Sequence, residues 1–157
     1  MQRRSFLQKI LAGSVVSYVV GLGQALAESV TRVWPERPRS AFSKETLDPT
    51  FEALFADRDI TESDKVRVLA AELAENGAVV PVKVETDFEA ALSITLIASK
   101  NPVPLVAQLS LSEFVKPFVA TRVKLAESSE IIAVVETADG LYQARRFVEV
   151  TIGGCSA

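Results

Sequence analysis

Alternation of apolar and polar residues dominates this 157-residue chain from residue 66 onward and restricts what it can fold into. An alternation of period two turns one side of an extended strand toward a core and the other toward solvent. The alternating runs occupy residues 80–85, 94–99, 105–112, 119–125, 131–137 and 141–152. Turn-forming residues separate most of these runs: Asn76-Gly77, Asn101-Pro102, Ser128-Ser129 and Ala138-Asp139-Gly140. Short strands at a spacing of roughly ten residues predict a β-sandwich or barrel, and the last pair of runs predicts a hairpin.

Three other stretches need separate interpretation. Residues 65–74 have good helix propensity, yet their first valines alternate with basic residues, so helix and strand both remain open. Pro81 cannot donate a ladder hydrogen bond, which predicts that its strand lies at a sheet edge or begins there. Residues 28–64 are less regular, and Asp48-Pro49-Thr50 is predicted to start a short helix through Phe55 because proline suits a first helical turn.

The first 27 residues have the order of an export signal. Arg3, Arg4 and Lys9 occur without an acidic residue, a mostly apolar run follows, and small residues end at Ala27. The adjacent arginines followed by Ser-Phe-Leu resemble the twin-arginine type, which exports folded proteins. The alternative is a membrane anchor, but the apolar run is shorter than the ~20 residues that a span needs. We therefore expect cleavage after Ala27 and a mature periplasmic protein that does not sit in the membrane.

Composition excludes several chemistries. The chain has no histidine and one cysteine, which removes Ser-His-Asp and Cys-His catalysis and makes a metal site or other cofactor unexpected. Removal of residues 1–27 takes away three basic residues, so the net charge changes from 17 − 20 = −3 to 14 − 20 = −6. No basic stripe is present, which argues against nucleic-acid binding. Hydrolysis by a pair of carboxylates stays open in principle, although no spacing singles out a pair.

The single cysteine, Cys155, follows Gly153 and Gly154 and precedes Ser156 and Ala157. An unpaired cysteine in an exported protein indicates an intermolecular disulfide or a free reactive thiol, and this placement favours a reactive thiol over an incidental one. If the last strand ends just before Gly153, three extended residues place the sulfur about 10 Å away from it. The glycines would make a thin, flexible swinging arm, although simple fraying looks the same in sequence.

These predictions divide the chain into four parts. A twin-arginine signal peptide occupies residues 1–27, and a lead-in with a short helix occupies residues 28–64. A β-sandwich domain follows over residues 65–152, and an arm carrying Cys155 occupies residues 153–157.

Several motifs, taken in chain order, give the sequence a resemblance to a known family. They are the twin-arginine start, AENGAVVPV at residues 74–82, NPVP at residues 101–104, and the Gly-Gly-Cys that ends at Cys155. With these motifs the chain resembles the SoxY family, the covalent sulfur carriers of the periplasmic thiosulfate-oxidising (Sox) system. The resemblance implies an immunoglobulin-like antiparallel β-sandwich in which residues 65–70 form a strand. One departure is that Ser156 and Ala157 stand where the family usually has two glycines.

The same resemblance implies roles and partners. Cys155 would be the point at which a sulfur intermediate is attached, and a SoxZ-like β-sandwich subunit would form a heterodimer with the chain. Three Sox enzymes would visit the arm transiently: a cytochrome complex that joins thiosulfate to the thiol, a sulfate thiohydrolase, and a sulfane dehydrogenase. The chain itself would be a carrier subunit and not an enzyme.

Two other functions remain open from the residues alone. The chain could be an exported structural or binding module whose single cysteine forms an intermolecular disulfide. A small thiol oxidoreductase is disfavoured, because the sequence has neither a Cys-x-x-Cys pair nor the βαβ pattern of a thioredoxin.

Overall fold

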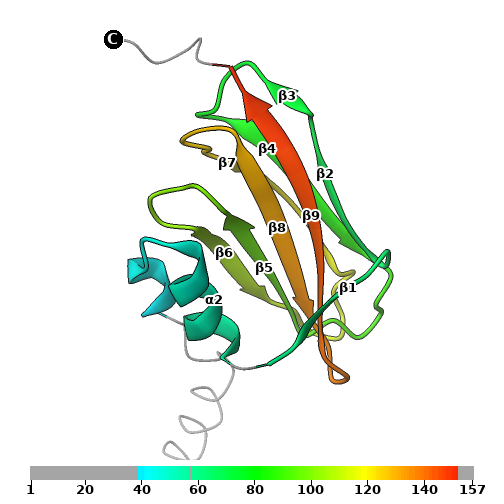
Figure 1. Cartoon of the computed structure of the whole chain (residues 1–157). Helices are drawn as coiled ribbons and strands as arrows, with labels where there is room; N and C mark the ends of the chain where they lie inside the picture. The colour runs from blue at the N-terminus through cyan, green and yellow to red at the C-terminus, as the bar shows by residue number, and fades with distance from the viewer. Residues whose placement is uncertain (1–38, 57, 152–157) are drawn as a thin grey trace, which may run out of the picture. The chain divides into compact units, whose positions relative to one another are not determined.

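The computed structural model describes residues 39–56 and 58–151, and the structural statements below concern these residues. They belong to a compact unit, Pro38–Ala157, whereas the predicted export signal, with Arg3, Arg4 and Ala27, lies outside the described residues. Two helical segments come first, the 3-10 helix η1 (Ala41–Ser43) and the helix α2 (Leu47–Phe55) (Figure 1). The strands that follow are β1 (Ile60–Glu62), β2 (Val66–Ala70), β3 (Leu73–Ala74), β4 (Val80–Thr86), β5 (Ser93–Ala98), β6 (Leu105–Ser110), β7 (Phe118–Val123), β8 (Ser129–Glu136) and β9 (Leu141–Val150).

The strands form two sheets, which confirms the predicted immunoglobulin-like β-sandwich. The larger sheet has the order β1-β9-β8-β5-β6, with β3 also paired to β9, and the smaller sheet has the order β2-β4-β7. Strand β9 pairs with β8 in antiparallel register along most of its length, and the predicted hairpin joins the two. On its other edge β9 pairs in parallel with β1 near its beginning and with β3 at its end.

The inner faces of the two sheets enclose the main core. Side chains from the smaller sheet meet those from β5 and β8, all with little or no exposed surface: Val66, Val80, Val82, Val84, Val123, Ile94, Leu96, Ile131, Ala133 and Val135. Burying each aliphatic side chain of this size is worth about 1.5–3 kcal/mol, so this core is the main source of stability. The alternation along β4 is visible in its burial, because every second residue from Val80 to Val84 points inward.

Helix α2 covers the outer face of the larger sheet (Figure 1). Phe55 of α2 and Ala41 of η1 pack there against Ile97 of β5 and against Ile132 and Val134 of β8. Strand β5 is therefore buried on both of its faces, which explains why its sequence alternates less cleanly than that of β4. The predicted helix start is confirmed, since Asp48 and Pro49 lie in the first turn, where a missing N–H costs nothing.

The structure settles the two stretches whose interpretation the sequence left open, residues 65–74 and the strand with Pro81. It also contains two strands that were not predicted, β1 and β3. Residues 66–70 form β2, so the strand implied by the resemblance is confirmed over the helix that propensity favoured. Pro81 lies at the second position of β4, one residue outside the ladder with β2, which begins at Val82. The prediction of a strand start therefore holds, but β4 is the central strand of its sheet and not an edge. Strands β1 and β3 are too short to show alternation.

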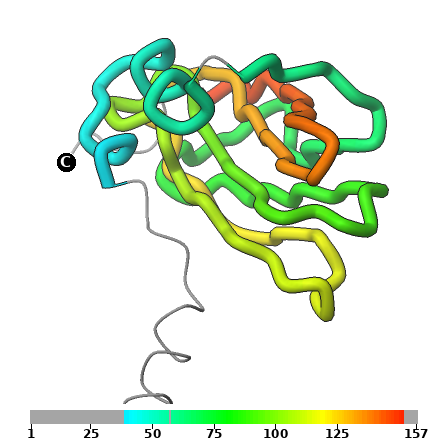
Figure 2. The backbone as a smooth tube through the Cα atoms, turned by 90° about the horizontal axis from the view of Figure 1, so that it is seen from below, coloured from blue at the N-terminus to red at the C-terminus, as the bar shows by residue number. Residues whose placement is uncertain are grey.

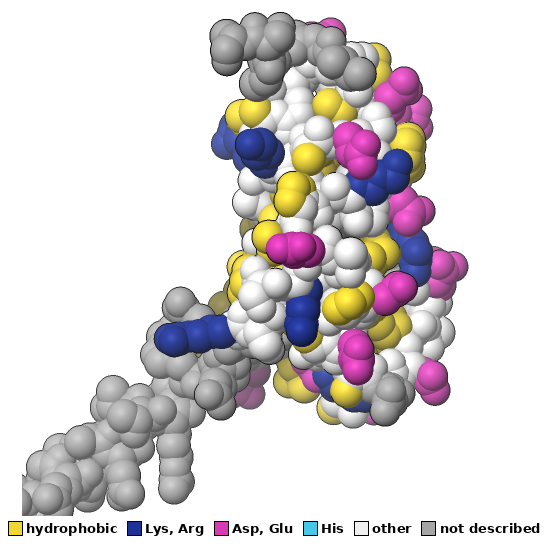
Figure 3. All heavy atoms as spheres, turned by 60° about the vertical axis from the view of Figure 1, so that its left-hand side comes forward, with side chains coloured by type: hydrophobic (Ala, Val, Ile, Leu, Met, Phe, Trp, Pro, Cys, Tyr) yellow, Lys and Arg dark blue, Asp and Glu magenta, His cyan; other side chains and the backbone are white. Residues whose placement is uncertain are grey.

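The surface mixes charged and apolar side chains. On the side of the molecule drawn in Figure 3, lysine, arginine and carboxylate side chains are interspersed with apolar ones. Seen from below, the β6–β7 loop, residues 111–117, projects from the body of the sandwich (Figure 2).

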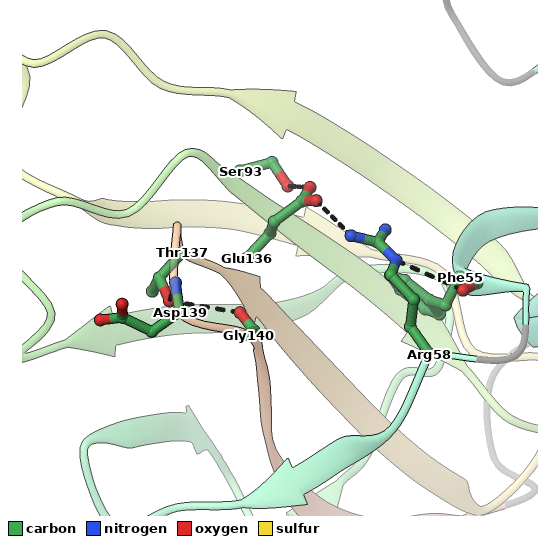
Figure 4. Close-up of polar contacts among 7 residues, drawn as sticks. All are labelled: Phe55, Arg58, Ser93, Glu136, Thr137, Asp139 and Gly140. Carbon is green, nitrogen blue, oxygen red and sulfur yellow. Dashed lines mark hydrogen bonds and ion pairs between the residues drawn. The ribbon is translucent and has the colours of Figure 1, made fainter.

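A polar network joins the segment after α2 to the end of β8 (Figure 4). Arg58 Nη1 donates to Glu136 Oε1 at 2.7 Å, and Ser93 Oγ donates to Glu136 Oε2 at 3.0 Å. The backbone N–H of Arg58 donates to the carbonyl of Phe55 at 3.2 Å, which links the arginine to the end of the helix. The hydrogen bond from Arg58 lowers the pKa of Glu136 below its usual value, and the bond from Ser93 acts in the same direction against desolvation. The network fastens the lead-in to the sandwich.

Replacing Glu136 with glutamine should lower the free energy of unfolding by about 1 kcal/mol near neutral pH, a modest figure because the pair is partly exposed. The native pKa of Glu136 is depressed, so its contribution is present above the ordinary glutamate pKa and is lost as pH falls through the native pKa. The difference between wild type and Glu136→Gln in urea unfolding should therefore be largest near pH 7 and shrink as the pH falls through the native pKa of Glu136.

Glu130→Gln provides the control, because the Glu130 carboxylate lies farther from its cation, at 3.6 Å from Arg145, and is more exposed. This variant should change stability less. An equal effect of the two substitutions near pH 7 would contradict the role given to Glu136.

Candidate functional site

The end of β9 is the place where the described part of the chain approaches its single cysteine. The strand ends at Val150 beside β3, at the end of the sandwich opposite the β8–β9 turn (Figure 1). Cys155 comes four residues after Thr151, the last described residue. Whatever surrounds the end of β9 therefore determines where the segment with Cys155 begins.

Backbone and side-chain hydrogen bonds hold the end of β9 from both edges. On one edge, Val150 N donates to Ser128 Oγ at 2.9 Å, and Ser128 Oγ also approaches the Val150 carbonyl at 3.4 Å. On the other edge, Glu149 N donates to the Glu72 carbonyl at 2.8 Å and Thr151 N donates to the Ala74 carbonyl at 3.1 Å. The chain is thus fixed as far as Thr151.

Gly77 closes the same end of the sandwich through a close approach of backbone to backbone. Its carbonyl accepts a hydrogen bond from Leu125 N at 2.7 Å. A Cβ atom at this position would lie 2.7 Å from the Leu125 carbonyl oxygen and 2.8 Å from Val150 Cγ1, which is closer than real contacts allow. A glycine is required here because no side chain fits between Leu125 and Val150.

Two asparagines shape the loops around this contact. Asn76 Oδ1 accepts from Ala78 N at 2.9 Å, an Asx-turn that presents Gly77. Asn101 Nδ2 donates to the Lys124 carbonyl at 2.7 Å, and Asn101 Oδ1 accepts from Ala126 N at 3.0 Å. These two bonds hold the loop that carries Leu125. The motifs at residues 74–82 and 101–104 therefore build one structure, which we call the arm base: Asn76, Gly77, Asn101, Leu125, Ser128 and Val150.

The predicted site residues themselves are not in view. Cys155 and the predicted arm residues Gly153, Gly154, Ser156 and Ala157 lie outside the described residues. Chain geometry nevertheless limits them, because four extended residues span at most about 14 Å from Thr151.

The described residues offer few other sites for chemistry. Within residues 39–151, excluding residue 57, no group of three or more acidic, histidine or cysteine side chains could hold a metal ion. In the same part of the chain, no helix is long and apolar enough to cross a membrane. The residues of the arm base hold the end of β9 and the loops beside it through hydrogen bonds and close packing.

The family model of sulfur oxidation protein SoxY matches residues 51–155. This chain belongs to the SoxY family.

A solved structure agrees with the family match. The sulfur carrier protein SoxY from Chlorobium limicola f thiosulfatophilum is 37% identical to the chain with a TM-score of 0.62, and the match covers 68% of this chain and 97% of that one. An engineered protein that is 15% identical has a TM-score of only 0.40, with 55% of this chain and 20% of that one covered, and it carries no argument. No curated protein matches the chain in a sequence comparison.

The family gives the chain its general function. It is a sulfur carrier protein of sulfur oxidation. Members of the family work with other proteins of the Sox system and are generally periplasmic.

Sequence reasoning identified the motifs of the arm base but gave them a simpler role. Asn76-Gly77, Asn101-Pro102 and Ser128-Ser129 were predicted as turns. The structure shows that Gly77 and Ser128 also contact Val150 of β9, and that Asn101 holds the residues on either side of Leu125. The Asn-Gly pair signalled a turn. Nothing in the sequence signalled that Val150, 73 positions after Gly77, packs against it.

Gly77→Ala should destabilise the protein by about 1–3 kcal/mol, because the added methyl group forces apart Leu125 and Val150 in a packed region. The damage should be greatest at the end of β9. Urea unfolding would measure the loss of stability, and amide hydrogen exchange would show faster exchange at Val150 and Thr151.

Ala78→Ser is a suitable control, because Ala78 is the exposed neighbour of Gly77 in the same turn. It should leave both measurements nearly unchanged. If Gly77→Ala were as stable as Ala78→Ser and exchanged no faster at Val150, the close contact would not exist in solution.

Proposed function

We propose that the chain carries sulfur intermediates of thiosulfate oxidation as covalent adducts of the Cys155 thiol. The observation that carries this proposal is the family match, which extends to residue 155, together with an arm base that fixes the chain four residues earlier. Cys155 is the single cysteine of the sequence, so a carrier that binds sulfur covalently through a thiol has one candidate residue.

The chemistry needs a thiolate and partners that supply the rest. A cytochrome complex would join the Cys155 sulfur to the outer sulfur of thiosulfate, with loss of the thiol proton and transfer of two electrons to its haem groups. Water would then cleave the bond between the outer sulfane sulfur and the sulfone group, which releases sulfate and protons and leaves a persulfide on Cys155. A sulfane dehydrogenase would oxidise the remaining sulfur. The chain performs none of these steps, so it is a carrier and not an enzyme.

The segment from Gly153 to Ala157 would be the swinging arm. A glycine has no Cβ, so Gly153 and Gly154 would allow a narrow and adaptable backbone that enters an enzyme cleft. The arm base supports this role, because an arm delivers its cargo reproducibly only if its origin is fixed. Ser156 and Ala157 are small enough to follow the cysteine into such a cleft.

The proposal includes a partner subunit and a route to the periplasm. A SoxZ-like β-sandwich subunit would form a heterodimer with the chain. The signal at residues 1–27 would direct export of the folded pair, with Arg3 and Arg4 recognised by the twin-arginine system and cleavage after Ala27.

Mass spectrometry of the protein purified from cells supplied with thiosulfate should find a sulfane or sulfonate adduct confined to the Cys155 peptide. The adduct should disappear on reduction, because a disulfide-type bond joins it to the chain. Cys155→Ser, which keeps the size of the side chain, should carry no adduct. A bare thiol, or a disulfide to another protein, under every sulfur source would overturn the proposal and favour an exported binding module.

Deleting Gly153 and Gly154 tests whether the C-terminal segment acts as a swinging arm or only carries a reactive thiol. The deletion halves the reach from Thr151 to Cys155, from about 14 Å to about 7 Å. Loading of thiosulfate by the partner enzymes should fall on the order of tenfold or more, since small displacements at an enzyme site are costly. Reaction with a small thiol reagent should keep the wild-type rate.

Replacing both glycines with serine is the matched control, because it keeps the length of the segment. This variant should load much faster than the deletion variant. If the deletion variant loads as fast as wild type, the segment does not act as an arm.

A further inference from the structure

The two outer faces of the sandwich differ in what covers them. Helix α2 and η1 cover the larger sheet, whereas the smaller sheet has no described helix on its outer face. We call this outer face the small-sheet face and define it by Leu69 of β2, by Pro81, Lys83 and Glu85 of β4, and by Phe118 and Arg122 of β7. In register, Leu69 lies opposite Lys83, Glu85 lies opposite Phe118, and Pro81 lies opposite Arg122.

Apolar side chains are exposed along this face and on the adjoining β6–β7 loop. Leu69 is 47% exposed and Phe118 is 48% exposed on the strands. On the loop, Val115 is 52% exposed and Phe114 is 89% exposed, the largest value among the described large apolar residues. An exposed group of aromatic and aliphatic side chains bordered by charges is typical of a protein-binding surface.

Two shallow, open depressions flank one lysine on this surface. One is lined by Leu69, Pro81 and Arg122, and the other by Glu85 and Phe118, with Lys83 lining both.

The charge of this surface is opposite to that of the rest of the chain. The described residues include 12 basic and 17 acidic side chains, a net charge of 12 − 17 = −5. The small-sheet face, its margin and the β6–β7 loop carry four basic side chains, Arg67, Lys83, Lys116 and Arg122, against three carboxylates, Glu85, Asp87 and Glu113, a net of 4 − 3 = +1.

Two of these carboxylates, Glu85 and Asp87, are already paired within the face. Arg67 donates two hydrogen bonds to Asp87, at 2.6 and 2.8 Å, and Lys83 pairs with Glu85. The hydrogen bond from Arg67 lowers the pKa of Asp87, and the hydrogen bond from Lys83 lowers the pKa of Glu85, so both stay ionised and paired near neutral pH. Lys116 and Arg122 make no ion pair within 4.0 Å among the described residues, which leaves them to meet carboxylates of a partner.

The position of the β6–β7 loop indicates whether the small-sheet face binds a permanent subunit or an enzyme that binds transiently. Phe118 begins β7 and Val123 ends it, so about 17 Å of strand separates Phe118 from the end of the sandwich where the arm base lies. An enzyme that captures Cys155 has to approach the arm base. A subunit bound at the other end of the smaller sheet would leave the arm base free for such enzymes.

We propose that the small-sheet face, with the β6–β7 loop, binds the second subunit of the heterodimer, through a partner surface that is apolar and bordered by carboxylates. The proposal rests on the proposed function, because that function includes a SoxZ-like subunit. It adds where the subunit binds and which chemistry holds it.

Binding of a purified SoxZ-family subunit to the intact carrier, measured by isothermal titration calorimetry, tests the proposal. Phe118→Glu should weaken binding about tenfold or more, as expected for an aromatic side chain at the centre of an interface. Arg122→Glu should also weaken binding and reduce its dependence on salt, because one attraction between opposite charges is lost. Phe147→Glu is the matched control, since Phe147 is 55% exposed on β9 of the other sheet. It should bind like wild type.

Hydrogen exchange provides a readout that needs no variant. Amides of β7 and of the β6–β7 loop should exchange more slowly in the complex, and those around α2 should not change. Thermal unfolding of each variant shows whether its fold is intact.

Several results would overturn the proposal. They are wild-type binding by Phe118→Glu, an equal loss in Phe147→Glu, no binding of the subunit by the wild-type chain, or self-association of the chain that Phe118→Glu abolishes. Failure of the proposed function itself is distinguishable, because it would appear as the absence of an adduct on Cys155 in the wild-type protein. An adduct on Cys155 combined with normal binding by Phe118→Glu would overturn only the placement of the subunit.

Discussion

Strand β9 is hydrogen-bonded along both edges, and the arrangement of the sandwich depends on this double pairing. Strand β8 holds one edge, and the short strands β1 and β3 hold the beginning and the end of the other. Pairing at the beginning brings in the chain that follows α2, and pairing at the end fixes the arm base. A slip of one residue would turn every β9 side chain to the opposite face, so the buried Val148 and Leu141 oppose any shift.

The molecule separates its tasks in space. Helix α2 seals the outer face of the larger sheet, the arm base lies at one end, and the exposed apolar loop lies toward the other. In the proposed carrier, this separation would keep the partner subunit away from the segment that the enzymes visit. The sandwich is rigid enough to hold the two regions apart, since its core is continuous between the sheets.

The sequence predicted the longer strands and missed the two shortest. Period-two alternation and turn residues located β4, β5, β6, β7 and the β8–β9 hairpin, even though β5 and β8 are buried on both faces. Strands β1 and β3 have three and two residues and pair in parallel with β9, whose residues are more than 70 positions away. Such pairing depends on the fold as a whole. The central position of β4 in its sheet was not predicted either. Pro81 shows only that its own residue cannot donate a hydrogen bond, and it says nothing of whether the rest of the strand pairs on both edges.

The candidate site was predicted in part. Its residue types were visible as motifs, and the family resemblance that they carried is confirmed by the family match. Their assembly into the arm base was not visible, because it depends on contacts such as that between Gly77 and Val150. Cys155 and the glycines before it remain a prediction, outside the described residues.

The double pairing of β9 also bears on synthesis of the protein. A ribosome makes β1 and β3 long before it makes the strand with which they pair, so neither can find its place until translation has passed Val150. The larger sheet is completed only five residues before Cys155 emerges. The proposed twin-arginine route accepts only folded proteins, so chains released early, which lack β9, would be poor cargo for it. Under this proposal, folding would select for chains that extend at least to Val150.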